Sequence, residues 1–285
     1  MKHTPTENFL DTIEVRVAGT REEVEAAQHL RYRVFYEECN AIATTEVEEE
    51  KRDIDEYDAI SDHLIVVDRK LGCGPESIVG TYRLLRQNVA EKHGQFYTSD
   101  EYDISPLISY GASLLELGRS CVLAEYRVRP VLQMMWSAIA EYLTLYDIGL
   151  MFGCASMHIV DVNCIKKELS YLYHYHLAPP EIRPVALPAR HIDMNMISKD
   201  RIDRKAVFNN LPPLFKGYIR LGAFIGDGAV VDLQFGTTDV CIVLPTHLVT
   251  QKYRRHYERA NSIVMPDKPF TAGSKIKQTV HQSAE

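Results

Sequence analysis

The spacing of hydrophobic and polar positions predicts an early strand followed by a helix. Apolar and polar residues alternate over residues 13–18, which is typical of a half-buried strand. Thr20 and Glu23 have the spacing of a capping box, and apolar residues then recur at helical intervals as far as Val34. The chain therefore begins with a strand that leads directly into an amphipathic helix.

The same patterns predict four further strands and two further helices before residue 178. The strands are expected at residues 63–68, 77–85, 113–122 and 151–159. One helix should begin near Pro130 and end near Tyr146, because proline is favoured in the first helical turn. Asp161 is expected to cap the other helix, which should end near Tyr175. This order of elements predicts an α+β, or mixed α/β, fold.

Proline becomes frequent after Ala178, and this change suggests an extension that packs on the core. A strand is predicted at residues 239–244 and a helix at about 246–261. We therefore expect one elaborated domain over residues 13–265, with its core at about 13–178 and its C-terminal extension at about 179–265. Residues 266–285 are expected to form a mobile tail.

Charge is distributed unevenly in this acidic chain. The 32 basic and 39 acidic residues leave a net charge of −7, which argues against a protein that coats nucleic acid. Ten acidic and two basic residues lie within residues 37–58, a run that is typical of a solvated loop or flexible flap. Basic residues gather instead in segments 199–220 and 252–259.

The sequence predicts a cytoplasmic protein that needs neither a metal nor a disulfide framework. No apolar segment follows the N-terminal Lys2 and His3, and the longest uncharged stretches are shorter than the roughly 20 residues that cross a bilayer. The six cysteines include no C-x-x-C pair, and the histidines have no metal-ligand spacing.

Four short motifs, in matching order, resemble those of the acyl-homoserine lactone synthases. They are Leu30-Arg31-Tyr32-Arg33-Val34-Phe35, Asp55-Glu56-Tyr57-Asp58, Val79-Gly80-Thr81-Tyr82-Arg83-Leu84 and Glu116-Leu117-Gly118-Arg119. Those synthases are a branch of the GNAT N-acyltransferase superfamily and use acyl-carrier protein as donor. The resemblance implies a central, mostly antiparallel sheet flanked by helices.

The segments at residues 211–223 and 237–241 extend a second resemblance, to the bacterial L-ornithine N-α-acyltransferases, over roughly residues 13–260. That family transfers a 3-hydroxyacyl chain from acyl-carrier protein to the α-amine of L-ornithine, giving lyso-ornithine lipid. The resemblance thus implies acyl-carrier protein and ornithine as partners. It implies no cofactor beyond the phosphopantetheine thioester of the co-substrate.

Carried over residue by residue, the motifs place Glu116 and Arg119 at the catalytic centre, with Glu116 as the general base. The alternative for Glu116 is a structural salt bridge to Arg31 or Arg83. In this superfamily a main-chain N–H also polarises the thioester oxygen where two central strands separate, here near residues 119–122. The residues implied in acceptor binding are Arg31, Phe35, Asp55, Asp58 and Arg83.

Two groups of arginines are candidates for contact with the donor. Arg127 and Arg129 lie where acetyl-CoA enzymes have a glycine-rich pyrophosphate loop, and they could hold the single phosphodiester of phosphopantetheine. Arg254 and Arg255 belong to the basic segment 252–259, which could dock an acidic carrier protein or contact the anionic inner membrane. For both groups the alternative is a solvated surface.

Two other functions remain open at this stage. The acceptor could be another amino acid or a homoserine-lactone-type amine, although Ala41 replaces a tryptophan of the synthases and argues against an S-adenosylmethionine-type acceptor. A non-catalytic, GNAT-like binding or membrane-associated protein is the second alternative. Retention of Arg31, Asp58, Arg83 and Glu116 together argues against loss of catalysis.

Overall fold

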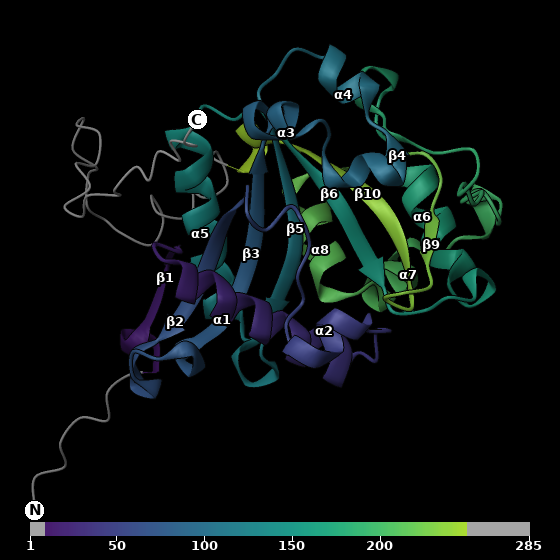
Figure 1. Ribbon diagram of the computed structural model, residues 1–285. Coiled ribbons are helices and arrows are strands. Elements are labelled where there is room, and N and C mark those ends of the chain that lie inside the picture. The colour runs from purple at the N-terminus through teal and green to yellow at the C-terminus, as the bar shows by residue number, and fades with distance from the viewer. Residues whose placement is uncertain (1–8, 250–285) are drawn as a thin grey trace, which may run out of the picture.

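The computed structural model describes residues 9–249, in which a large sheet carries helices on both faces (Figure 1). The strand order within these residues is β1-β2-β3-β5-β6-β10-β8, with β9 paired to β10. Its strands are β1 (Ile13–Val17), β2 (Asp62–Asp68), β3 (Ile78–Arg86), β5 (Leu114–Val122), β6 (Leu150–Met157), β8 (Phe224–Ile225), β9 (Val230–Asp232) and β10 (Thr237–Pro245). Strands β4 (Tyr102–Asp103) and β7 (Val185–Ala186) form a small separate sheet.

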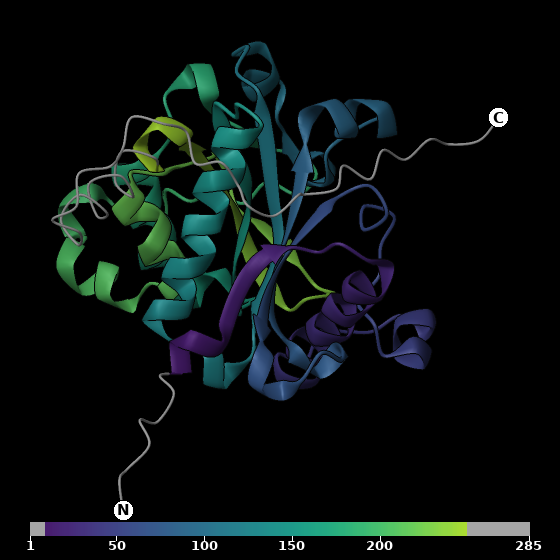
Figure 2. The same ribbon diagram turned by 90° about the vertical axis from the view of Figure 1, so that its left-hand side faces the viewer.

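One pair of neighbouring strands in the large sheet is parallel, namely β5 and β6, and the other pairs are antiparallel. Parallel pairing requires a crossover, which the 17-residue helix α5 (Arg129–Leu145) supplies. Helix α1 (Arg21–Tyr32) packs on β3 and β5, whereas α5 covers the opposite face near β1 (Figure 2). The predicted mixed α/β fold, with a mostly antiparallel central sheet flanked by helices, is therefore confirmed.

Six other α-helices complete the described chain. They are α2 (Thr45–Glu50), α3 (Gln87–His93), α4 (Ser105–Ser109), α6 (Lys166–His176), α7 (Arg204–Asn210) and α8 (Pro213–Leu221). The predicted starts of two helices are confirmed by their contacts. Thr20 Oγ accepts a hydrogen bond from the amide of Glu23 at 3.3 Å, and Pro130 lies in the first turn of α5. Asp161 caps a short 3₁₀ turn that leads into α6.

The C-terminal third contributes directly to the central sheet. Strand β10 pairs antiparallel with the whole of β6, from Thr238 opposite Met157 to Pro245 opposite Leu150. Residues 246–249 begin the helix that the sequence predicts after this strand, and the rest of that helix lies outside the described residues. The predicted tail at 266–285 also lies outside them. The segment after Ala178 thus extends the sheet from β6 to its far edge.

The acidic run at residues 37–58 is mostly exposed over residues 37–51, as its charge predicts, but its end is buried. Thr44 caps helix α2 within it, and the run ends in side chains that are withdrawn from solvent, since Asp53 is 3% and Asp58 6% exposed. Charge density indicated solvent exposure here because the buried arginines that neutralise these aspartates lie far away in sequence.

Candidate active site

The strands β5 and β6 separate after three residue pairs, which opens the sheet near its centre (Figure 1). Their pairing runs from Leu114 opposite Leu150 to Glu116 opposite Phe152. At the next position Gly153 has a φ of +152°, and a Cβ there would lie 2.1 Å from the carbonyl oxygen of Leu117. Glycine is required because its backbone touches the neighbouring strand at the point of separation.

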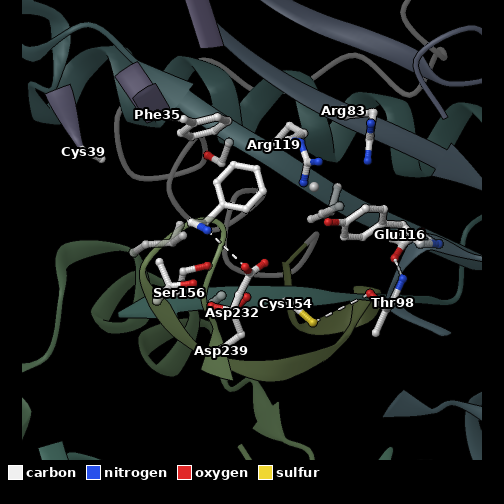
Figure 3. Close-up of a pocket in the computed structure, with 18 of the residues that line it drawn as sticks. Phe35, Cys39, Arg83, Thr98, Glu116, Arg119, Cys154, Ser156, Asp232 and Asp239 are labelled. Atoms are coloured by element: carbon white, nitrogen blue, oxygen red, sulfur yellow. Dashed lines mark hydrogen bonds between the residues drawn. The ribbon is translucent and has the colours of Figure 1, made fainter. Parts of the chain in front are cut away.

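A cavity of about 180 Å³ lies in this opening. Figure 3 shows arginines on one wall and carboxylates on the opposite wall. Its polar lining comes from residues 118–120 of β5, 154 and 156 of β6, and 232, 237 and 239 around β9 and β10. The separated strands thus leave a polar recess, open to ligand, at the middle of the sheet.

A bulge in β5 turns Arg119 toward this recess. Thr81 pairs with Cys121 and Arg83 with Gly118, so Arg119 and Ser120 together face one residue of β3. Arg119 has a φ of +52°, an uncommon conformation for a side chain other than glycine. In a regular strand Arg119 would point away from the face that holds Arg83, and the bulge brings both guanidinium groups to that face.

The three arginines of the predicted site form a closed ring of ion pairs with three aspartates. Going round the ring, each nitrogen–oxygen contact is Arg31–Asp53 (2.8 Å), Asp53–Arg119 (3.2 Å), Arg119–Asp55 (3.0 Å), Asp55–Arg83 (2.5 Å), Arg83–Asp58 (3.2 Å) and Asp58–Arg31 (2.6 Å). We call these six residues the Arg–Asp ring. Each charge has two partners of opposite sign, so the ring is neutral as a whole.

The Arg–Asp ring satisfies charges that burial would otherwise make costly. Arg31 is fully buried, and Arg83 is 4% exposed. Burial by itself would raise the pKa of Asp58, but the guanidinium groups of Arg31 and Arg83 outweigh that effect and hold the pKa below its usual range. Behind the ring, His63 Nε2 lies 3.0 Å from the carbonyl oxygen of Asp58. The ring fastens the acidic run to α1, β3 and β5.

Glu116 lies on the cavity wall and its carboxylate faces backbone amides. Its two oxygens accept hydrogen bonds from the N–H groups of Tyr97 at 2.9 Å and Thr98 at 2.6 Å. The alternative of a salt bridge to Arg31 or Arg83 is not found, since those arginines pair with aspartates. Burial raises the pKa of Glu116, against the lowering effect of these hydrogen bonds. A carboxylate whose pKa is raised in this way holds a proton more readily than a solvated one.

The predicted acceptor residues divide between the cavity and the structure behind it. Phe35, in the π-helical turn Arg33–Glu38, and Arg83 line the cavity, as do the predicted catalytic residues Glu116 and Arg119. Arg31, Asp55 and Asp58 lie outside the lining, in the Arg–Asp ring. Tyr97 and Phe235 cover Arg119, with their ring centroids 4.8 Å and 5.0 Å from its guanidinium carbon. The ring thereby presents Arg83 and Arg119 to the cavity.

The arginines expected at the donor side lie away from the cavity lining. Arg127 donates from Nε to the carbonyl of Val122 at 2.8 Å and forms a two-point ion pair with Glu38. Arg129 is exposed at the start of α5. Arg254 and Arg255 lie outside the described residues. The structure therefore leaves the donor-binding roles of these residues as predictions.

Sequence reasoning missed four carboxylates of the site. Asp53 completes the Arg–Asp ring. The spacing Asp53-x-Asp55-x-x-Asp58 could have indicated it, since Asp53 and Asp58 are the two buried aspartates of the acidic run. Glu101, Asp232 and Asp239 lie together at the other wall of the cavity. Asp232 and Asp239 come from the paired strands β9 and β10, and Glu101 lies more than 130 residues earlier, so no local pattern links all three.

Cys121, on β5 two residues after Arg119, lacks the features of a catalytic nucleophile. The side chain is buried, and burial raises the pKa of its thiol far above the usual range. Its Sγ faces the carbonyl of Leu30 at 3.8 Å. Cys121 is therefore a small buried thiol of the core.

Comparison with known proteins identifies the class of this domain. Residues 30–137 match the model of the acetyltransferase (GNAT) domain, and this match runs from the end of α1 through the Arg–Asp ring and Glu116 into the first half of α5. A CoA-dependent acyl-homoserine lactone synthase of known structure aligns over 90% of this chain and 94% of its own, at 13% identity and a TM-score of 0.47. The chain is a GNAT-type acyltransferase.

Two curated relatives show to which acyltransferase family the chain belongs. An L-ornithine N(alpha)-acyltransferase from Rhizobium meliloti is 45% identical over 86% of this chain and 84% of its own length. Another from Rhodobacter capsulatus is 40% identical over 86% of this chain and 95% of its own length. The chain belongs to the L-ornithine N(alpha)-acyltransferase family. This membership favours the enzyme over the non-catalytic alternative.

Within the part of the chain that the structure describes, no helix combines the length and apolar character needed to span a bilayer.

Proposed function

We propose that this enzyme transfers a 3-hydroxyacyl group from acyl-carrier protein to the α-amine of L-ornithine, producing lyso-ornithine lipid in the cytoplasm. The names of its relatives support ornithine as acceptor, and the motif resemblance supports the carrier-protein donor and the product. The observation that carries the proposal is the cavity between β5 and β6, where a raised-pKa carboxylate, Glu116, and a cation, Arg119, line one recess. The inner-membrane surface, where the product belongs, is the second expected contact.

The proposed reaction is direct attack by the amine. The neutral α-nitrogen forms a bond to the thioester carbon, and Glu116 accepts the proton that the nitrogen loses. Collapse of the tetrahedral intermediate breaks the carbon–sulfur bond, and the phosphopantetheine thiolate leaves and is protonated. A backbone N–H at the separated strands would stabilise the oxyanion. The α-carboxylate is assigned to Arg119, which is 14% exposed toward the cavity.

Purified enzyme mixed with 3-hydroxyacyl-carrier protein and single amino acids tests the acceptor. Release of the carrier-protein thiol with L-ornithine, and formation of the N-acyl product by mass spectrometry, are expected. No thiol release with ornithine refutes the ornithine assignment. Release with homoserine lactone or another amino acid in its place would identify the alternative acceptor.

Glu116→Gln tests the base. We expect kcat to fall by about 10²- to 10⁴-fold and the acidic limb of the pH–rate profile to disappear. The substituted side chain would also face two backbone donors with an amide, so thermal unfolding of the variant must be measured alongside. Glu125→Gln, at an exposed carboxylate just after β5, is the matched control. A folded Glu116→Gln enzyme with full rate at every pH removes Glu116 as base.

A further inference from the structure

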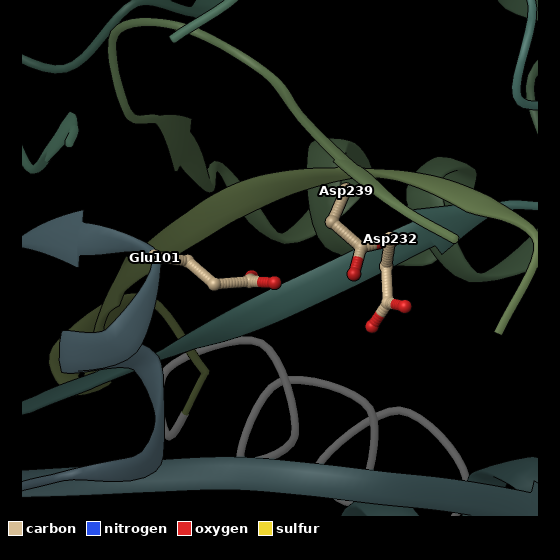
Figure 4. Close-up of side chains that lie close together, drawn as sticks. All are labelled: Glu101, Asp232 and Asp239. Atoms are coloured by element: carbon tan, nitrogen blue, oxygen red, sulfur yellow. The ribbon is translucent and has the colours of Figure 1, made fainter. Parts of the chain in front are cut away.

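Three carboxylates converge at the wall of the cavity opposite the Arg–Asp ring. Figure 4 shows Glu101 pointing across toward Asp232 and Asp239. One oxygen from each residue lies within 4.8 Å of the others. Glu101 and Asp239 are 6% and 7% exposed, and Asp232 is half-buried. We call these three residues the carboxylate cluster.

The neighbours of the carboxylate cluster leave one oxygen unused. Asp232 Oδ1 already accepts the amides of Gln234 at 2.8 Å and Phe235 at 3.0 Å. Glu101 faces the thiol of Cys154 at 3.3 Å and Nη1 of Arg190 at 3.3 Å. Asp239 Oδ1 is buried and has no hydrogen-bond partner among the described residues. A buried carboxylate oxygen without a donor is costly unless a ligand supplies one.

Charge points to the kind of ligand that fits. Among the described residues, the three carboxylates form one ion pair, with Arg190, whose side chain is 43% exposed. The cluster therefore has an excess of negative charge, and burial together with mutual repulsion raises the pKa of Glu101 to about 7. A cation with several hydrogen-bond donors would neutralise it, and a primary ammonium offers three N–H donors for three carboxylates.

We propose that the carboxylate cluster binds the side-chain ammonium of the acceptor amino acid, with Asp239 Oδ1 as its central ligand. This inference rests on the proposed function, because the cluster shares the cavity with Glu116 and Arg119. Asp232 and Asp239 line that cavity, and Glu101 lies directly behind Cys154 of its wall. An amino acid held by its α-carboxylate at Arg119 would extend its side chain across the recess toward the cluster.

Selectivity between L-ornithine and L-norvaline tests the inference, since norvaline has the same carbon chain and lacks the δ-amine. The full-length enzyme should show a kcat/KM for ornithine that exceeds that for norvaline by roughly 10- to 100-fold, the range of a hydrogen bond to a charged group. Asp239→Asn and Glu101→Gln should each reduce this ratio several-fold or more, mainly through KM for ornithine. Asp200→Asn, at an exposed aspartate remote from the cavity, should keep the wild-type ratio.

The acceptor panel separates failure of this inference from failure of the proposed function. Turnover of ornithine with an unchanged ornithine-to-norvaline ratio in both cluster variants overturns the inference and leaves the function standing. Turnover of L-lysine or L-2,4-diaminobutyrate but not ornithine overturns the ornithine assignment and supports the ammonium site. A neutral amino acid preferred over every cationic one overturns both.

Calorimetric titration with Mg²⁺, Ca²⁺ or Zn²⁺ tests whether the carboxylate cluster binds a metal ion instead of an ammonium group. We expect no binding of these ions that depends on Asp239. Binding to the wild-type enzyme that is lost in Asp239→Asn, and that excludes ornithine, would make the cluster a metal site and overturn the ammonium assignment.

Discussion

Arg31 and Asp58 form a two-point ion pair that is almost entirely withdrawn from water. Nη1 lies 2.9 Å from Oδ1 and Nη2 lies 2.6 Å from Oδ2, with the side chains 0% and 4% exposed. The pair joins helix α1 to the end of the acidic run. Because both residues also have second partners in the Arg–Asp ring, neither charge can be removed without leaving others uncompensated.

Asp58→Asn should therefore destabilise the protein strongly. It leaves Arg31 and Arg83 each short of one carboxylate, and breaking a buried ion pair in this way costs about 3–5 kcal/mol. Urea unfolding followed by circular dichroism measures the loss. Arg21→Gln is the control, since Arg21 is 86% exposed in its pair with Glu25 and its loss should cost under about 0.5 kcal/mol. A loss at Asp58 no larger than that of the control contradicts the role assigned to the ring.

Gly153→Ala should disrupt the separation of β5 and β6. The new Cβ would meet the Leu117 carbonyl oxygen at 2.1 Å in a backbone conformation that side chains rarely adopt. We expect a loss of at least about 2 kcal/mol of unfolding free energy, together with loss of activity. Gly217→Ala, in α8 where nothing lies within 4 Å, should instead stabilise by up to about 1 kcal/mol. Equal effects at the two glycines would count against the close contact.

The carboxylate cluster should make stability depend on pH when no amino acid is bound. Burial raises the pKa of Glu101 to about 7 and that of Asp239 to about 6. The native state thus binds more protons than the unfolded state above about pH 4, and the contribution of these groups is lost as the pH rises through 6 and 7. The charged and titratable groups that face Glu101 and Asp239 are each other, Asp232, Tyr97, Tyr102, Cys154, Cys241, Arg190 and Arg119.

Asp239→Asn tests this pH dependence of stability, because the direction of its effect on the unfolding free energy can be predicted. At pH 8 it removes a repelled charge and should stabilise the ligand-free protein by about 1–3 kcal/mol. At pH 5 Asp239 is protonated in the native state but already ionised in the unfolded chain, so the variant should be stabilised by about half as much as at pH 8. Chemical denaturation at the two pH values measures both. The same change at pH 5 and pH 8 would show that Asp239 does not titrate in this range.

Charge reversal in the C-terminal basic segment tests carrier-protein docking. Arg254→Glu with Arg255→Glu should raise the apparent KM for acyl-carrier protein and leave the fold intact, because electrostatic attraction to an acidic partner is lost. Lys166→Glu with Lys167→Glu, an exposed pair at the start of α6, is the matched control. Unchanged kinetics in the first double variant would exclude that segment as the docking surface.

The sequence predicted the fold well where the signals were local. Alternation and capping located β1, α1, β3, β5 and α5 to within a few residues, since each depends on neighbours along the chain. The arrangement of the site was harder to predict, because it depends on contacts across the sheet. The motifs identified Arg31, Asp58 and Arg83. They did not show that these residues pair with each other or that Asp53 joins them, because this pairing depends on the bulge at Arg119 and on strand register.

The Arg–Asp ring also bears on the order of folding. Its members come from α1, the acidic run, β3 and β5, so it closes after these four segments have assembled. We therefore expect its contacts to be little formed in the folding transition state, where substitutions mainly change the rate of unfolding. We expect ring substitutions to accelerate unfolding far more than they slow folding. The Arg–Asp ring would then slow the unfolding of the half of the sheet that carries Glu116.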